Sequence, residues 1–123
     1  MSIEVIRRTM DTIDRCGWAI IVHPDENGLL HGYTVGLTFF RVPELHASGL
    51  RPEKLHEMLD ALARQQSTLG AFTAGQISTA VGVDVRLDPR TDLQCMNLVL
   101  ALFGDNNPVP PTALDVSVLK EAT

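Results

Sequence analysis

The chain has 123 residues, of which 45% are hydrophobic and 20% charged, and its formal net charge is −5. This composition is typical of a folded protein and excludes a disordered tail, and the length suits one domain over residues 1–123. The negative net charge disfavours nucleic acid as a partner, because neutralising phosphates requires clustered Lys and Arg.

Residues 2–15 are predicted to form a helix that begins at Ser2, a favourable N-cap residue. Apolar residues recur near helical spacing along it, at Ile3, Ile6, Met10 and Ile13. Gly17 suits the end of this helix, since glycine tolerates a left-handed conformation. The apolar run 18–22 then predicts a short buried strand, and residues 25–28 predict a turn that ends in Asn27-Gly28.

Large and small side chains alternate between residues 31 and 39, which predicts a strand. The large ones, which we expect in the core, are Tyr33, Val35, Leu37 and Phe39, and the small ones are Gly32, Thr34, Gly36 and Thr38. The small face allows a close approach to the backbone. We favour a helix packed there, with residues 53–67 as the candidate. A ligand groove offering the hydroxyls of Thr34 and Thr38 is the alternative.

The rest of the chain predicts further strands and helices. A third strand is expected over 44–50, a clear amphipathic helix over 52–68, a half-buried strand over 81–87, and a last strand over 114–118. Helical spacing favours a buried helix over 93–103, although a central strand also fits, and 105–108 reads as a turn. Together these elements predict an α+β fold: a single compact domain with a mostly antiparallel sheet and two to three helices packed on it.

Several short segments carry a resemblance to a known family. They are Gly17-Trp18, the block Tyr33-Thr34-Val35-Gly36-Leu37, Pro43-Glu44-Leu45 and Gly49-Leu50. Over residues 13–70 the chain resembles domain-of-unknown-function family 4262, a family of small bacterial and sometimes phage-encoded proteins. The resemblance supports the predicted fold and a cytoplasmic location, and it implies no activity.

The cysteines and the start of the chain also favour the cytoplasm. Cys16 and Cys95 lie far apart and form no CxxC pair, so we expect two reduced thiols. The first residues lack the unbroken apolar stretch of a signal peptide. No run of about 18 apolar residues is present that would span a membrane, so no membrane association is expected.

Glu44 and His46 are the weak catalytic candidates, because alternate residues of a strand share a face and a carboxylate beside an imidazole makes a general base. His23, His31 and Tyr33 join them as candidate ligand-binding residues, together with Thr34 and Thr38. The favoured alternative is that these polar groups are solvated or paired locally.

No metal or other cofactor is predicted. The histidines, which include His56, show no HxH, HxxxH or HExxH spacing. Cys16 lies at the C-terminal end of a predicted helix, where a thiolate is disfavoured, and Cys95 is expected in the core. The glycines form no phosphate-binding motif.

Phe40 and Phe72 are the candidate anchors for a partner protein. The leading hypothesis is therefore a non-catalytic interaction or regulatory domain whose partner is another protein or a second copy of this chain. The alternative is a small-molecule binder or enzyme using a pocket around Tyr33, Thr34, Glu44 and His46. A deep cleft joining Glu44 to His46 would favour this second hypothesis.

Overall fold

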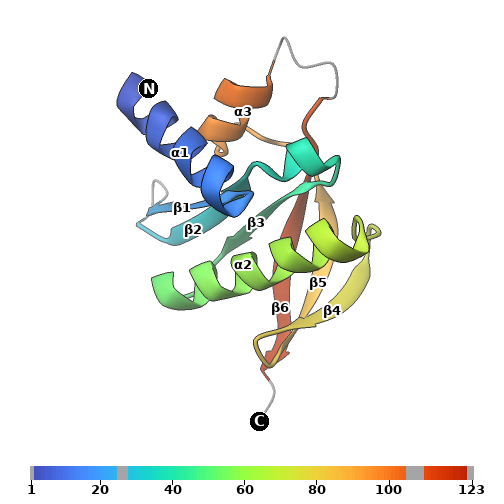
Figure 1. Ribbon diagram of the computed structural model, residues 1–123. Helices are drawn as coiled ribbons and strands as arrows, with labels where there is room; N and C mark the ends of the chain where they lie inside the picture. The colour runs from blue at the N-terminus through green and yellow to red at the C-terminus, as the bar shows by residue number, and fades with distance from the viewer. Residues whose placement is uncertain (1, 25–27, 105–109, 122–123) are drawn as a thin grey trace.

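The computed structural model describes residues 2–24, 28–104 and 110–121, with side chains through residue 119. Within these residues, three α-helices and a six-stranded, mostly antiparallel sheet form a single compact α+β domain, as predicted (Figure 1). In chain order the elements are α1 (Ile3–Cys16), β1 (Ala19–Pro24), β2 (Leu30–Val35), the 3₁₀ helix η1 (Leu37–Phe40), β3 (Glu44–Ser48), α2 (Pro52–Leu69), β4 (Gln76–Ala80), β5 (Val83–Arg90), α3 (Asn97–Phe103) and β6 (Ala113–Glu121).

The sheet joins an N-terminal and a C-terminal half through its one parallel pair. The strand order is β1-β2-β3-β6-β5-β4. The predicted hairpin of β1 and β2 is confirmed, and β3, β5 and β4 continue the antiparallel pairing within their own halves. β3 and β6 pair in parallel, with Glu44 opposite Ala113 and His46 opposite Asp115. The last strand in the chain therefore lies in the middle of the sheet.

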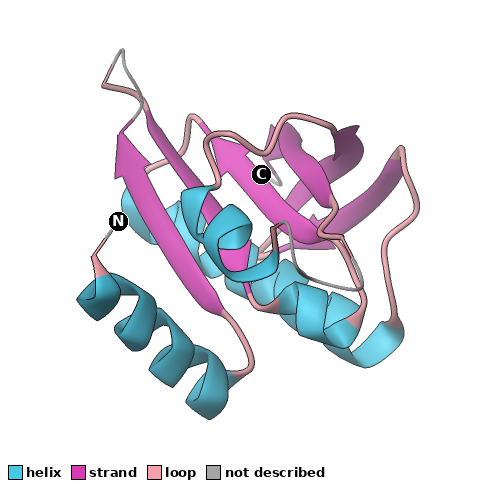
Figure 2. Ribbon diagram, turned by 90° about the horizontal axis from the view of Figure 1, so that it is seen from above, coloured by secondary structure: helices cyan, strands magenta, loops and turns pink. Residues whose placement is uncertain are grey.

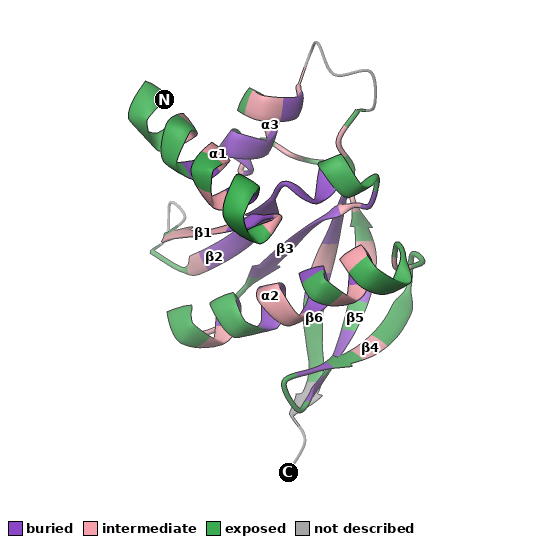
Figure 3. Ribbon diagram, viewed as in Figure 1, coloured by how far each residue is buried: buried purple, intermediate pink, exposed green. Residues whose placement is uncertain are grey.

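Helices pack on both faces of the sheet. α2 covers one face, where Leu45 and Ala47 of β3 join a core that continues onto β5 and β6. On the other face, Tyr33 and Val35 of β2 pack with residues of α1 and α3. Figure 2, seen from above, shows α1 and α2 on opposite sides of β1. Figure 3 shows the buried residues concentrated in β2 and β3, whereas much of β4 is exposed.

The helix predicted over 52–68 is confirmed, and its apolar stripe makes the centre of the core. Five α2 side chains on that stripe are fully buried: Leu55, Met58, Leu59, Leu62 and Ala63. Burying each of the larger ones contributes about 1.5–3 kcal/mol. Gly32 of β2 lies against this helix, and a Cβ atom placed there would lie 3.1 Å from Leu59 Cδ1. The small face of β2 is thus packed by a helix at this position, as we favoured.

The strand predicted over 31–39 ends early, at Val35. Gly36 takes a positive φ of 123°, which ends the strand, and the chain then turns into η1. The change of direction leaves Phe39 58% exposed, so its predicted place in the core is wrong. Leu37 is buried, as predicted, but it lies in the 3₁₀ helix and not in a strand. The alternation of large and small side chains therefore extends past the end of the strand.

Two further elements differ from the sequence prediction. β4 was not predicted, because most of its side chains are exposed and no apolar alternation marks it. The helix predicted over 93–103 begins only at Asn97, and residues 93–96 form a turn closed by a hydrogen bond from the Met96 N–H to the Leu93 carbonyl. The turn predicted at 105–108 lies outside the described residues, and of the turn predicted at 25–28 only Gly28 is described. Among the described helices, none has the length and apolar character to cross a bilayer.

Candidate functional site

One face of the sheet carries a row of ionisable side chains, one from each of five adjacent strands. We name it the polar row: His23 (β1), His31 (β2), His46 (β3), Asp115 (β6) and Arg90 (β5). The strand register produces the row, since His23 lies opposite His31 and His46 lies opposite Asp115. Directly opposed side chains on one face are about 5 Å apart, close enough to interact. The row lies on the face that carries α1 and α3.

His46 is held at the centre of this row by both of its ring nitrogens. Nδ1 lies 3.0 Å from Asp115 Oδ1, and Nε2 lies 3.1 Å from His31 Nδ1. Because a carboxylate only accepts hydrogen bonds, Nδ1 of His46 is the donor to Asp115, and its Nε2 then accepts from His31. Burial, followed by the positive charge of Arg90, lowers the pKa of His46, and Asp115 opposes this shift. The neutral imidazole is therefore favoured.

Arg90 connects Asp115 to Cys95. Its Nη1 donates to both carboxylate oxygens of Asp115, at 3.1 and 3.3 Å, and its Nη2 donates to Cys95 Sγ at 3.1 Å. The charges of Arg90 and Asp115 therefore balance each other locally. A guanidinium with donors on two nitrogens also fixes the orientation of both of its partners.

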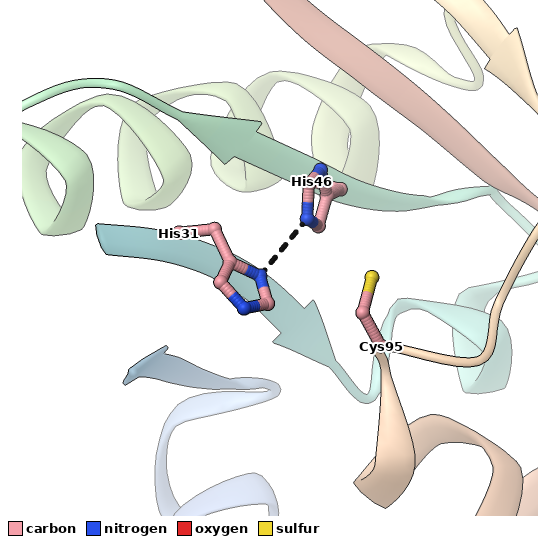
Figure 4. A group of neighbouring side chains, drawn as sticks. All are labelled: His31, His46 and Cys95. Carbon is pink, nitrogen blue, oxygen red and sulfur yellow. Dashed lines mark hydrogen bonds between the residues drawn. The ribbon is translucent and has the colours of Figure 1, made fainter. Parts of the chain in front are cut away.

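A pocket of about 190 Å³ opens beside these groups, lined by His31, His46, Ser48, Arg90 and Cys95. Cys95 reaches it from the turn that precedes α3. Its Sγ and one ring nitrogen of each histidine all lie within 4.8 Å of one another. Figure 4 shows the imidazole rings of β2 and β3 meeting through their nitrogens, with the Cys95 sulfur nearby. Two imidazoles and one thiol therefore converge on the same small volume.

Glu44, the first predicted catalytic candidate, belongs to a different cluster. Its fully buried carboxylate accepts five hydrogen bonds, from the N–H groups of residues 36, 37 and 38 and from the hydroxyls of Thr34 and Thr38. Burial raises the pKa of Glu44, and the hydrogen bonds oppose that change. Since the two ring nitrogens of His46 bind Asp115 and His31, Glu44 and His46 do not form the predicted base pair.

The other predicted ligand-binding residues divide between the two clusters. Thr34 and Thr38 bind Glu44, so their hydroxyls serve the fold. Tyr33 is buried and its Oη accepts a hydrogen bond from the Leu98 N–H, at 3.3 Å. His23 packs edge-on against His31, with 4.0 Å between ring centroids, and it also contacts the ring of Tyr33.

The two predicted interaction residues differ in exposure. Phe40 is 45% exposed and lies edge-on to Trp18. Phe72 is half-buried and packs against the core under α2.

Four residues that line or support the pocket were not selected from the sequence: Ser48, Arg90, Cys95 and Asp115. Cys95 is expected in the core because it lies in the apolar run 93–103, yet it is half-buried at the pocket. Only the β3–β6 pairing could have brought Asp115 next to His46, and no local motif predicts a pairing across 69 residues.

Comparison with known proteins identifies a family whose function is unknown. Residues 12–116 match the family described as Domain of unknown function (DUF4262). No curated protein and no solved structure was found to match the chain.

Proposed function

We propose that this chain, which belongs to the DUF4262 family, binds a small polar molecule in the pocket beside the polar row and acts on it there. The observation that supports the proposal is the oriented, buried imidazole of His46 at the edge of that pocket. Asp115 fixes the ring so that Nε2 carries the lone pair. This lone pair accepts the hydrogen bond from His31. When a ligand or an ion replaces that hydrogen bond, the nitrogen takes up a proton or coordinates a metal ion, and either role activates a water molecule or a hydroxyl group.

The dimensions and charge of the pocket limit what it accepts. Its volume of about 190 Å³ lies below the range of about 300–1,000 Å³ that is usual for drug-sized ligands. Arg90, Ser48 and the imidazoles surround it with hydrogen-bonding groups. A small polar ligand, such as a short-chain carboxylate or an inorganic oxyanion, has the size and chemistry that fit.

A variant that fills the pocket tests this proposal. Ser48 is exposed at the end of β3 and lines the pocket, so Ser48→Phe should block it without disturbing the core. Thr79→Phe is the matched control, because Thr79 is also exposed on a strand but lies on β4, at the far edge of the sheet, and does not line the pocket. We expect native mass spectrometry of gently purified protein to show a ligand adduct that is lost on denaturation, present in wild type and Thr79→Phe and absent in Ser48→Phe.

The same three proteins are then screened against small carboxylates, phosphate and sulfate by ligand-observed NMR. We expect at least one of these probes to bind the wild type and Thr79→Phe and its binding to be lost in Ser48→Phe. Binding that persists in Ser48→Phe would place the ligand elsewhere on the molecule. Absence of both an adduct and a bound probe in the wild type would overturn the proposal.

An interaction role is the second proposal, supported by two consecutive exposed aromatic residues on η1, Phe39 and Phe40. Large exposed rings on a rigid turn are effective anchors for a partner. The partner tested first is a second copy of this chain. We expect sedimentation velocity to show self-association that Phe40→Ser abolishes and Leu69→Ser, a change at another exposed apolar residue, leaves intact. A wild-type protein that is monomeric at every concentration would overturn the homodimer proposal.

A further inference from the structure

We infer that His31, His46 and Cys95 form a binding site for a transition-metal ion, Zn²⁺ above all, with a fourth coordination position open to the pocket. This inference deepens the proposed function, since it names the group that would activate a ligand in the same pocket. The three ligand atoms come from β2, β3 and the turn before α3. Figure 4 shows how they converge.

The distances fit a tetrahedral ion after a small adjustment. Zn–N bonds of about 2.0–2.1 Å and a Zn–S bond of about 2.3 Å imply N–N and N–S separations of roughly 3.3 and 3.6 Å in a tetrahedral site. His31 Nδ1 and His46 Nε2 are 3.1 Å apart. Cys95 Sγ and one ring nitrogen of each histidine lie within 4.8 Å of one another, so a bound ion would have to draw the sulfur closer.

The surroundings of His46 are those of a metal ligand. Histidines that bind metals usually donate their second ring N–H to a carboxylate, which fixes the ring and strengthens the ligand nitrogen. His46 makes this contact with Asp115, at 3.0 Å, and directs Nε2 toward His31. Asp115 is in turn held by Arg90.

The charge balance also accommodates a cation. The guanidinium of Arg90 lies near Cys95 Sγ, but its charge is offset by Asp115, to which it makes two contacts. When the ion binds, Cys95 loses its thiol proton to solvent, and the proton on Nδ1 of His31 transfers through solvent to Nε2 of the same ring. The two neutral imidazoles and one thiolate leave the bound ion a net charge of +1. Such an ion attracts an anionic or polar fourth ligand.

The ligand set and the open position favour a reactive site over a purely structural one. Thiolate and imidazole ligands select zinc and related ions over magnesium or calcium. Structural zinc sites have four protein ligands, whereas catalytic sites have three and keep one position for water or substrate. Here three ligands line a pocket that Ser48 and Arg90 complete. Zinc bound there would supply an activated water to a small ligand.

Cobalt binding tests the inference directly, because a cobalt–thiolate bond gives a charge-transfer absorption band in the near ultraviolet. We expect the chelator-treated protein to bind one Co²⁺ per chain with this band, and one Zn²⁺ to displace it. Cys95→Ser should abolish the band and weaken Zn²⁺ binding about 100-fold or more, on the scale of losses at zinc sites. Cys16→Ser is the matched control, since Cys16 is exposed on α1, and it should leave both unchanged.

Two further variants keep the test decisive if a histidine variant fails to fold. Asp115→Asn retains all three ligand atoms, and we expect it to weaken Zn²⁺ binding by about 10–100-fold. His56→Gln, on the exposed side of α2, should have no effect. Circular dichroism establishes that each protein is folded. Absence of the charge-transfer band in wild type, or equal Zn²⁺ affinity in Cys95→Ser and Cys16→Ser, would overturn the metal site.

Failure of the metal site and failure of the proposed function give different results. If no metal binds but a small-molecule adduct disappears in Ser48→Phe, the pocket function stands and the metal inference falls. If Zn²⁺ binds through Cys95 but no small molecule enters the pocket, the metal inference stands and the proposed activity falls.

Discussion

Glu44→Gln is expected to lower the free energy of unfolding by about 3 kcal/mol, because it disrupts a buried cluster of hydrogen bonds. All five groups around the Glu44 carboxylate are donors, and three of them are backbone N–H groups of residues 36–38. A glutamine side chain offers only one acceptor oxygen, and its NH₂ group would face donors that have no other partner in the cluster. Each buried donor left without a partner costs about 1–3 kcal/mol.

Urea denaturation of both proteins measures this loss. Glu57→Gln is the matched control, because Glu57 is exposed on α2 and should change stability by no more than about 0.5 kcal/mol. The result also separates a structural role of Glu44 from a chemical one. A loss below about 1 kcal/mol, together with loss of ligand binding in the pocket, would return Glu44 to the list of catalytic candidates.

Gly36→Ala is expected to destabilise the fold by about 3 kcal/mol, since two costs combine at this position. The backbone has a φ of 123°, which L side chains rarely adopt. A Cβ atom would also lie 2.9 Å from the Gly17 carbonyl oxygen and 3.0 Å from Trp18 Cα, and both are backbone atoms that cannot move aside on their own.

Gly75→Ala separates the two costs. Gly75 has a φ of 81°, and nothing lies within 4 Å of a Cβ atom placed there, so only the backbone cost of about 1 kcal/mol applies. The difference between the two variants, measured by urea denaturation, then gives the cost of the close approach between Gly36 and residues 17–18 together with the extra backbone cost of a φ of 123° over one of 81°. Equal losses would show that this approach relaxes without cost.

Much of the fold could be predicted from the sequence because its elements carry local signals. Such signals come from residues close together in the sequence. They give the apolar stripe of α2, the Ser2 cap of α1 and the hairpin of β1 and β2. Phe39 shows the limit of such signals. Its spacing of two from Leu37 fits a strand. The backbone instead bends at Gly36, whose N–H binds the buried Glu44, and continues as η1, which leaves the ring of Phe39 exposed.

The candidate site was less predictable, because it is made by long-range pairing. His31 and His46 were selected as polar residues on strands, and the register of β2 and β3 does bring them together. Asp115 and Arg90 lie on strands of the C-terminal half, and Cys95 lies in a turn that the sequence predicts as helix. The three residues of the proposed metal site show no ligand spacing in the sequence, because each lies on a different element. A search by local motif therefore misses the cluster.

The parallel pairing of β3 with β6 has a consequence for the order of folding. His46 and Asp115 are 69 residues apart, so their contact closes the chain over more than half its length, whereas β1 and β2 meet through a short connection. Closing a long loop costs more entropy, and non-local strand pairing slows folding. We expect β1, β2 and α2 to associate first and β6 to insert between the two halves afterwards. Asp115 would then reach His46 only in this late step. A completed pocket would therefore indicate that the whole sheet has formed.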